Sequence, residues 1–168
     1  MEPELAKRIV GGIREAGINF VTYLPETRLS QILPLMQQDH SFKLVPVSSE
    51  AEGISIAAGA SLAGKQVASY MEGTGIYVSC YNLLTVGKRF GVPMLLLVAY
   101  LGSFADRRNS FLYVLSGTRL VPLLDAFDIP YQILENGAGL EGKIKDAVRM
   151  MNSLKLPVAL LFTGEFTL

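Results

Sequence analysis

Hydrophobic positions along the chain alternate between helical and extended spacing from one end to the other. Leu5, Ile9 and Ile13 recur at helical intervals, and Gly17 follows them as a stop signal. Runs of β-branched, aromatic and aliphatic residues indicate strands between the helical stretches. The pattern predicts strands over 18–24, 42–47, 66–71, 92–100, 130–134 and 157–162. It predicts further helices over about 27–38, with a kink or restart at Pro34, and over 49–63, 75–90, 118–127 and 140–151.

This order of elements indicates the fold class. The run over 92–100 is continuously apolar, which is typical of a strand that is buried on both faces of a parallel sheet. Strands separated by helices favour right-handed crossovers. We therefore expect one α/β domain over 1–168, a three-layer α/β/α fold with a six-stranded, mainly parallel sheet. Ligands of such folds bind at the carboxyl ends of the strands. The loops to search therefore follow Leu24, Val47, Met71 and Tyr100.

Composition narrows the class of protein. Half of the 168 residues are hydrophobic and 18% are charged, so an extended disordered chain is excluded. Fifteen basic residues balance fifteen acidic ones, and this neutrality argues against a nucleic-acid partner and favours an assembly. No apolar run is long enough to span a membrane and the first residues do not resemble a signal peptide, so we expect a cytoplasmic protein. One cysteine and one histidine predict no metal site on this chain.

The segment 47–75 carries the most chemical information. Ser49 can cap the helix that follows the second strand, and Glu52, three residues on, completes a capping box. Glu50 in the first turn would favour the helix dipole. Capping explains Glu52 better than Glu50, because Glu50 falls at the carboxyl edge of the sheet, where a ligand would lie. The small residues 57–60 allow a backbone or a cofactor to approach closely.

These residues resemble a known family. The carriers are SEAEGISIAAGASLAGK at 49–65, with Glu50 nine residues before Gly59, the turn MEGTG at 71–75, and PMLLLV at 93–98. Together they are similar to the pyrimidine-binding domain of thiamine diphosphate enzymes. The resemblance is greater to the separate alpha subunit of sulfopyruvate decarboxylase and to the first domain of phosphonopyruvate decarboxylase, and it extends more weakly over most of the chain.

The resemblance implies a role for Glu50. In the family this carboxylate hydrogen-bonds the aminopyrimidine ring nitrogen and promotes the imino tautomer that removes the thiazolium C2 proton. The activated cofactor then attacks a 2-oxo acid and accepts electrons as carbon dioxide leaves. Such proton sharing needs a carboxyl group in a fairly dry pocket. Gly73, Thr74 and Gly75 are expected to line the pyrimidine pocket.

Other positions bear on the substrate. Relatives often carry a glycine near 77 and an asparagine near 78, where this chain has Tyr77 and Val78, and these departures put the substrate and the activity in question. Arg107 and Arg108 follow the predicted strand at 92–100, and their guanidinium groups could hold a carboxylate, sulfonate or phosphonate. A solvated turn is the other explanation for both arginines.

One family motif is missing. Family members bind the cofactor's diphosphate through Mg²⁺ on a second domain with a Gly-Asp-Gly motif, and this chain has none. The resemblance therefore implies the alpha subunit of a two-chain decarboxylase, with thiamine diphosphate and Mg²⁺ held jointly with a beta subunit. We also expect self-association and a short 2-oxo acid substrate with an anionic tail. The alternatives are a carboligase subunit similar to acetolactate synthase and a non-catalytic partner protein that retains the fold.

Overall fold

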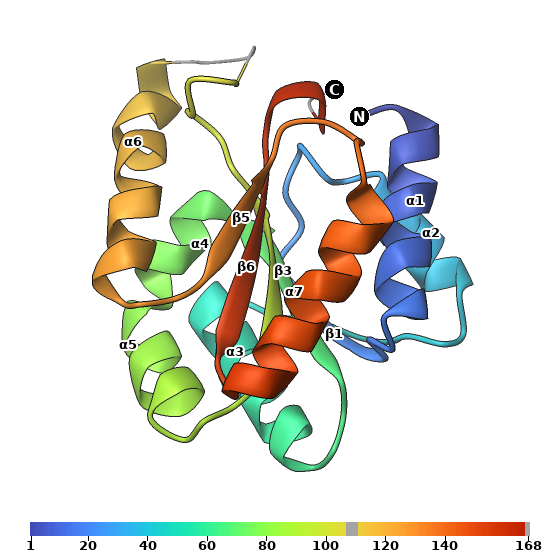
Figure 1. Ribbon diagram of the computed structural model, residues 1–168, viewed down its shortest axis with the longest axis vertical. Helices are drawn as coiled ribbons and strands as arrows, with labels where there is room; N and C mark the ends of the chain where they lie inside the picture. The colour runs from blue at the N-terminus through green and yellow to red at the C-terminus, as the bar shows by residue number, and fades with distance from the viewer. Residues whose placement is uncertain (107–110, 167–168) are drawn as a thin grey trace.

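The computed structural model describes residues 1–106 and 111–166 (Figure 1). Its centre is a six-stranded sheet in the order β2-β1-β3-β4-β6-β5, and every neighbouring pair of strands is parallel. The strands are β1 (Phe20–Tyr23), β2 (Lys43–Pro46), β3 (Val67–Glu72), β4 (Met94–Ala99), β5 (Tyr131–Leu134) and β6 (Pro157–Phe162). The predicted strands are thus all present, most of them shorter at their ends than the pattern indicates.

Helices cover both faces of this sheet, so the predicted three-layer arrangement is confirmed (Figure 1). One face carries α1 (Pro3–Glu15), α2 (Ile32–Gln38) and α7 (Leu140–Leu154). The other carries α3 (Glu50–Leu62), α4 (Gly73–Val78), α5 (Cys80–Asn82), the π-helix η1 (Leu83–Lys88) and α6 (Phe111–Ala126). A 3-10 helix η2 (Gly164–Phe166) follows β6. Of the helices in the described part of the chain, none is both long and apolar enough to cross a membrane.

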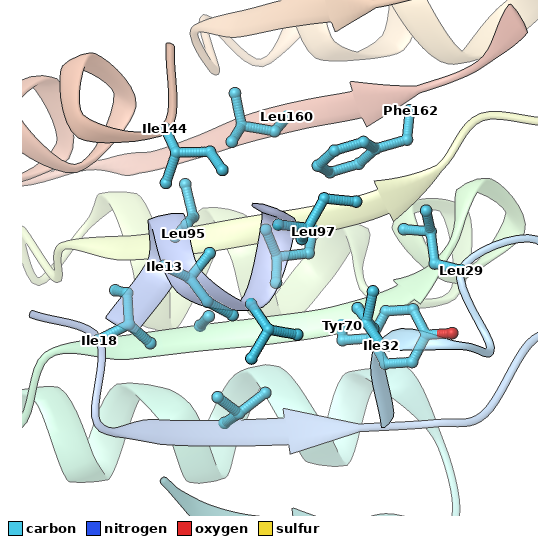
Figure 2. Close-up of a cluster of buried hydrophobic side chains, with 14 of the residues drawn as sticks. Ile13, Ile18, Leu29, Ile32, Tyr70, Leu95, Leu97, Ile144, Leu160 and Phe162 are labelled. Atoms are coloured by element: carbon cyan, nitrogen blue, oxygen red, sulfur yellow. The ribbon is translucent and has the colours of Figure 1, made fainter. Parts of the chain in front are cut away.

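Two strands form the buried centre of the sheet. All six residues of β4 and all six of β6 are buried, as their continuous apolar sequences predict. Figure 2 shows the core on the α1 and α7 face, where Leu97 of β4 and Phe162 of β6 belong to the same cluster as Tyr70 of β3. The core on each side of the sheet is continuous, so the carboxyl ends of these strands are held in a rigid frame.

Three predicted helices differ from the structure. The helix expected over 27–38 begins only at Ile32, because the Glu26 carboxylate accepts the backbone N–H groups of Arg28 and Leu29 and closes a turn there. Pro34 lies in the first turn of α2, where its missing N–H costs no helical hydrogen bond. The helix expected over 75–90 is divided into α4, α5 and η1 and begins earlier. Helix α6 likewise begins before the expected residue 118.

An ion pair joins the first and last long helices on one face. Arg8 of α1 donates from Nε to Glu141 of α7 at 2.6 Å and from Nη2 to the second carboxylate oxygen at 2.8 Å. The paired guanidinium lowers the pKa of Glu141 from its ordinary value to about 2. The pair is partly exposed, so its contribution to the free energy of unfolding is small.

We predict that this pair makes stability depend on acid. A carboxyl whose pKa is lowered on folding stabilises the protein above its unfolded value of about 4.5, and this is lost as pH falls toward 2. The melting temperature of wild type should exceed that of Glu141→Gln by about 1–2 °C at pH 6. The difference should vanish near pH 2. Glu4→Gln, which removes an exposed carboxylate of α1, should melt like wild type; a pH-independent gap for Glu141→Gln would contradict the ion-pair account.

Candidate cofactor and substrate site

The topology sets one end of the sheet apart as the place for a ligand. From β1 the chain moves outward to β2 and then returns to β3 on the other side of β1, so the strand order reverses between β1 and β3. Loops that leave such a switch point in opposite directions open a crevice at the carboxyl edge. The loops after β1, β2 and β3 all emerge here, and they carry most of the residues that the sequence singled out.

Glu50 and Glu52 have different roles at the start of α3. The Ser49 side chain accepts the Glu52 backbone N–H at 3.3 Å, and the Glu52 carboxylate accepts the backbone N–H of Ser48 at 2.7 Å. The capping arrangement is therefore present, although Glu52 reaches back one residue further than a standard capping box. In the described part of the chain, no hydrogen bond or ion pair engages the Glu50 carboxylate, which is half-buried. Capping thus accounts for Glu52 and leaves Glu50 available for a ligand.

Gly75 lies directly against this free carboxylate. A Cβ atom at Gly75 would lie 2.5 Å from Glu50 Cγ and 2.9 Å from both Cδ and Oε1. A larger residue at 75 would have to push the Glu50 side chain out of this position, so glycine here allows α4 to pack directly beside the carboxylate. Glu50 begins α3 and Gly75 lies in α4, with the whole of β3 between them in the sequence, and the fold brings them together across the crevice.

The other two residues of the glycine-rich turn face elsewhere. A Cβ atom at Gly73 would lie 3.1 Å from Leu120 Cδ2 of α6 and 3.4 Å from the Ala99 carbonyl oxygen of β4. The lack of a side chain at Gly73 thus allows α6 to approach the sheet. Thr74 is exposed, and its hydroxyl donates to Glu72 Oε1 at 3.0 Å. Of the predicted site residues, Gly75 lies against Glu50, Thr74 is exposed near the start of α4, and Gly73 packs against α6 and β4.

The small residues of α3 do not approach a ligand as expected. Ala57 and Ala58 are buried in the core of this face, whereas Gly59 is exposed and has no atom within 4 Å of its Cβ position. The close approach occurs at Gly53, where a Cβ atom would lie 3.3 Å from Thr22 Oγ1 of β1. The small residues thus let α3 pack tightly on the sheet.

The loop after β1 contributes a carboxyl group that sequence reasoning missed. Glu26 accepts a short hydrogen bond from the Tyr70 hydroxyl and another from the Leu29 backbone N–H at 2.6 Å. Burial raises the pKa of Glu26 above its ordinary value despite these bonds, and the nearby charge of Glu72 raises it further. The pKa of Tyr70 is also raised, by burial and by Glu26. This end of β3 therefore holds several acidic groups close together.

A buried ion pair joins the loop after β1 to the loop after β4. Arg28 Nη2 donates to Asp106 Oδ1 at 2.6 Å, and the two side chains are 2% and 1% exposed. The other Asp106 oxygen accepts the Gly102 backbone N–H at 2.8 Å. In the sequence both residues look like surface charges, and only their positions after two predicted strands could have indicated this contact.

Tyr77 and Val78, the two residues that depart from the family pattern, line a groove between α4 and α6. The Tyr77 hydroxyl donates to the Ser116 carbonyl oxygen at 2.6 Å and so ties the two helices together. Val78 is 56% exposed. The groove encloses about 560 Å³ and is lined by Thr74, Tyr77, Val78, Leu112, Leu115, Ser116 and Arg119. Thr74, the neighbour of Gly75 in α4, thus also lines the groove.

Two predicted substrate residues, Arg107 and Arg108, lie outside the described residues. Within 1–106 and 111–166, no group of three or more His, Cys, Asp or Glu side chains is arranged to hold a metal ion.

Comparisons with known proteins identify relatives of this chain, although no family model matches it. The chain is 30% identical over 158 residues to the sulfopyruvate decarboxylase subunit alpha of Methanocaldococcus jannaschii, covering 94% of this chain and 92% of that protein. It is 24% identical over 144 residues to the sulfopyruvate decarboxylase of Methanosarcina acetivorans, covering 84% of this chain but only 36% of that protein.

Among solved structures, benzoylformate decarboxylase from Polynucleobacter necessarius superposes with a TM-score of 0.77 at 18% identity. The match covers 97% of this chain and 30% of the decarboxylase, so it shows a shared fold over less than a third of that enzyme. The near full-length similarity to the archaeal subunit, together with this fold, shows that the chain belongs to the sulfopyruvate decarboxylase alpha-subunit family, with the fold of a thiamine diphosphate enzyme's pyrimidine-binding domain.

Proposed function

We propose that this chain is the alpha subunit of a two-chain, thiamine diphosphate-dependent decarboxylase that acts on a short 2-oxo acid with an anionic tail, such as sulfopyruvate. The observation that carries the proposal is the Glu50 carboxylate, which lies free of partners among the described residues against the backbone of Gly75 at the switch point. A scaffold without catalytic function has no need of a carboxylate held in this way. Family membership supports the choice of reaction.

The residues at this edge fit the aminopyrimidine end of the cofactor. Glu50 offers an acceptor for a ring nitrogen, and the backbone of 73–75 offers a surface with few side chains beside it. When bound, thiamine diphosphate supplies an electron sink for the carbon–carbon bond that breaks on decarboxylation. The chain's own contribution is to orient the ring and to exchange a proton at the Glu50 carboxylate. Gly75 leaves room for that carboxylate in its present position, which a larger residue at 75 would displace.

The Mg²⁺ and diphosphate half of the site belongs, in this proposal, to a beta subunit. The lengths of the relatives support the division: the chain covers 92% of a protein named as a subunit alpha but only 36% of the longer sulfopyruvate decarboxylase. We further propose that the alpha subunits self-associate. Leu112 and Leu115 in the groove between α4 and α6 are 70% and 74% exposed, which favours their burial against another chain.

The anionic tail of the substrate would be held by arginine. Arg107 and Arg108 follow Asp106 in the sequence, between β4 and α6. A guanidinium group pairs well with a carboxylate, sulfonate or phosphonate. The proposal therefore favours sulfopyruvate and phosphonopyruvate over pyruvate.

Replacing Glu50 with Gln tests the central role. The substitution keeps the size of the side chain but removes its acid–base function, so the decarboxylation rate of the reconstituted enzyme should fall about 10²–10⁴-fold. The fold should survive, since a first-turn charge stabilises a helix by only about 0.3–1 kcal/mol. Glu52→Gln is the matched control, because it retains a capping side chain, and it should change the rate little. Equal losses in the two variants would favour helix capping as the role of both glutamates.

Gly75→Ala tests the close approach. The added methyl group must displace the Glu50 side chain, so we expect kcat to fall about 10- to 100-fold with little change in assembly. Gly142→Ala is the control, because Gly142 lies in α7 on the opposite face with no atom within 4 Å of its Cβ position. That variant should keep full activity and melt at or slightly above the wild-type temperature. Wild-type kcat in Gly75→Ala would contradict the proposed position of Glu50.

The isolated chain tests the division of the site. Supplied with thiamine diphosphate, Mg²⁺ and sulfopyruvate, it should release no carbon dioxide, and adding the partner chain should restore release. Size-exclusion chromatography with light scattering should show at least a dimer of the chain alone and a larger complex with the partner. Full turnover by the isolated chain would overturn the two-chain proposal.

A further inference from the structure

Arg28 is the one buried cation in the described part of the chain. Its side chain is 2% exposed and forms a single hydrogen bond, from Nη2 to Asp106 Oδ1 at 2.6 Å. Nε and Nη1 are both buried and have no hydrogen-bond acceptor among the described residues. These two nitrogens carry three of the five N–H groups of the guanidinium, so most of its donors are unused.

A guanidinium in this state destabilises the folded protein. Buried donors normally have partners, and a buried charge normally has its hydrogen bonds satisfied as well as its counter-ion nearby. Asp106 supplies the counter-ion but divides its oxygens between Arg28 and the Gly102 backbone N–H. No group of the described residues accepts a hydrogen bond from these donors, which leaves them available to a ligand that binds at this edge.

The position of Arg28 indicates which acceptor this is. Arg28 lies in the loop after β1 and its partner Asp106 in the loop after β4, at the edge that carries Glu50 and Gly75. The carboxylates at this edge, Glu26 and Glu72 among them, would repel an anionic substrate. A cation held among them offsets that repulsion for a ligand that can reach it.

We propose that Arg28 determines substrate specificity by donating from Nε and Nη1 to the anionic tail of the substrate. The inference rests on the proposed function and changes one part of it, since it assigns the tail to a described residue in the loop after β1 in place of Arg107 and Arg108. Both nitrogens are buried, so in this proposal a ligand reaches them only when the atoms that cover them move aside. The ion pair with Asp106 holds the guanidinium in place while this happens.

The test compares substrates in the reconstituted two-chain enzyme. Arg28→Lys keeps a cation that can pair with Asp106 but loses the donors at Nε and Nη1. We expect kcat/KM for sulfopyruvate to fall about 10- to 100-fold, equivalent to about 1.4–2.8 kcal/mol, and kcat/KM for pyruvate to change less than about threefold. Calorimetric titration with sulfoacetate, which has the tail but no 2-oxo group, should show the same loss of affinity.

Asp106→Asn is the matched control. It weakens the ion pair but leaves the Arg28 donors in place, so it should alter both substrates by a similar factor and preserve their ratio. If Arg28→Lys does not fold, the double variant Arg28→Gln/Asp106→Asn removes both buried charges and is compared in the same way. Equal losses for sulfopyruvate and pyruvate would overturn the inference and leave Arg28 as a structural link between two loops.

The two proposals fail in different ways. If the wild-type enzyme never decarboxylates sulfopyruvate, yet Arg28→Lys loses sulfoacetate binding, the proposed function is contradicted and the role of Arg28 is supported. If wild type and Arg28→Lys decarboxylate sulfopyruvate equally well and bind sulfoacetate equally, the function is retained and Arg28 is rejected as the specificity residue.

Discussion

The parallel direction of all six strands is the constraint on which the site depends. Parallel strands need a crossover between each pair, so every loop that follows a strand emerges at the same edge of the sheet. The buried strands β4 and β6 hold that edge rigid, and the reversal of strand order between β1 and β3 opens it. The parallel direction of the strands alone brings residues that follow three different strands to this edge: Glu50, Gly75, Glu26 and Arg28.

The edge is unusual in how its charges are satisfied. Glu52 uses its carboxylate in a helix cap and Asp106 divides its oxygens between an arginine and a backbone N–H, so both are engaged by the fold. Glu50 has no protein partner among the described residues, and two nitrogens of Arg28 have none there either. Polar groups that a fold leaves unpaired reduce its stability, and they are retained most readily where a ligand pairs with them.

The proposed cofactor site and the apolar groove proposed to bind another chain lie next to each other in the molecule. Thr74 precedes Gly75, which contacts Glu50, and it also lines the apolar groove between α4 and α6. Tyr77, which departs from the family pattern, fastens those helices through the Ser116 carbonyl oxygen. A chain that covered the groove would therefore contact the turn proposed to hold the cofactor ring, so binding of a partner and completion of the site would be one event.

Local sequence patterns were enough to predict the fold class, the six strands and the difference between Glu50 and Glu52, because these follow from periodicity, apolar runs and capping residues. The turn expected at 71–75 was wrong, since these residues are the end of β3 and the first residues of α4. Only the folded chain shows three contacts: Gly75 lies against Glu50, Gly73 leaves room for α6 beside the sheet, and Arg28 is buried against Asp106. Such contacts join residues that are distant in sequence, and no local pattern encodes which loops a parallel sheet brings together or which charges it buries.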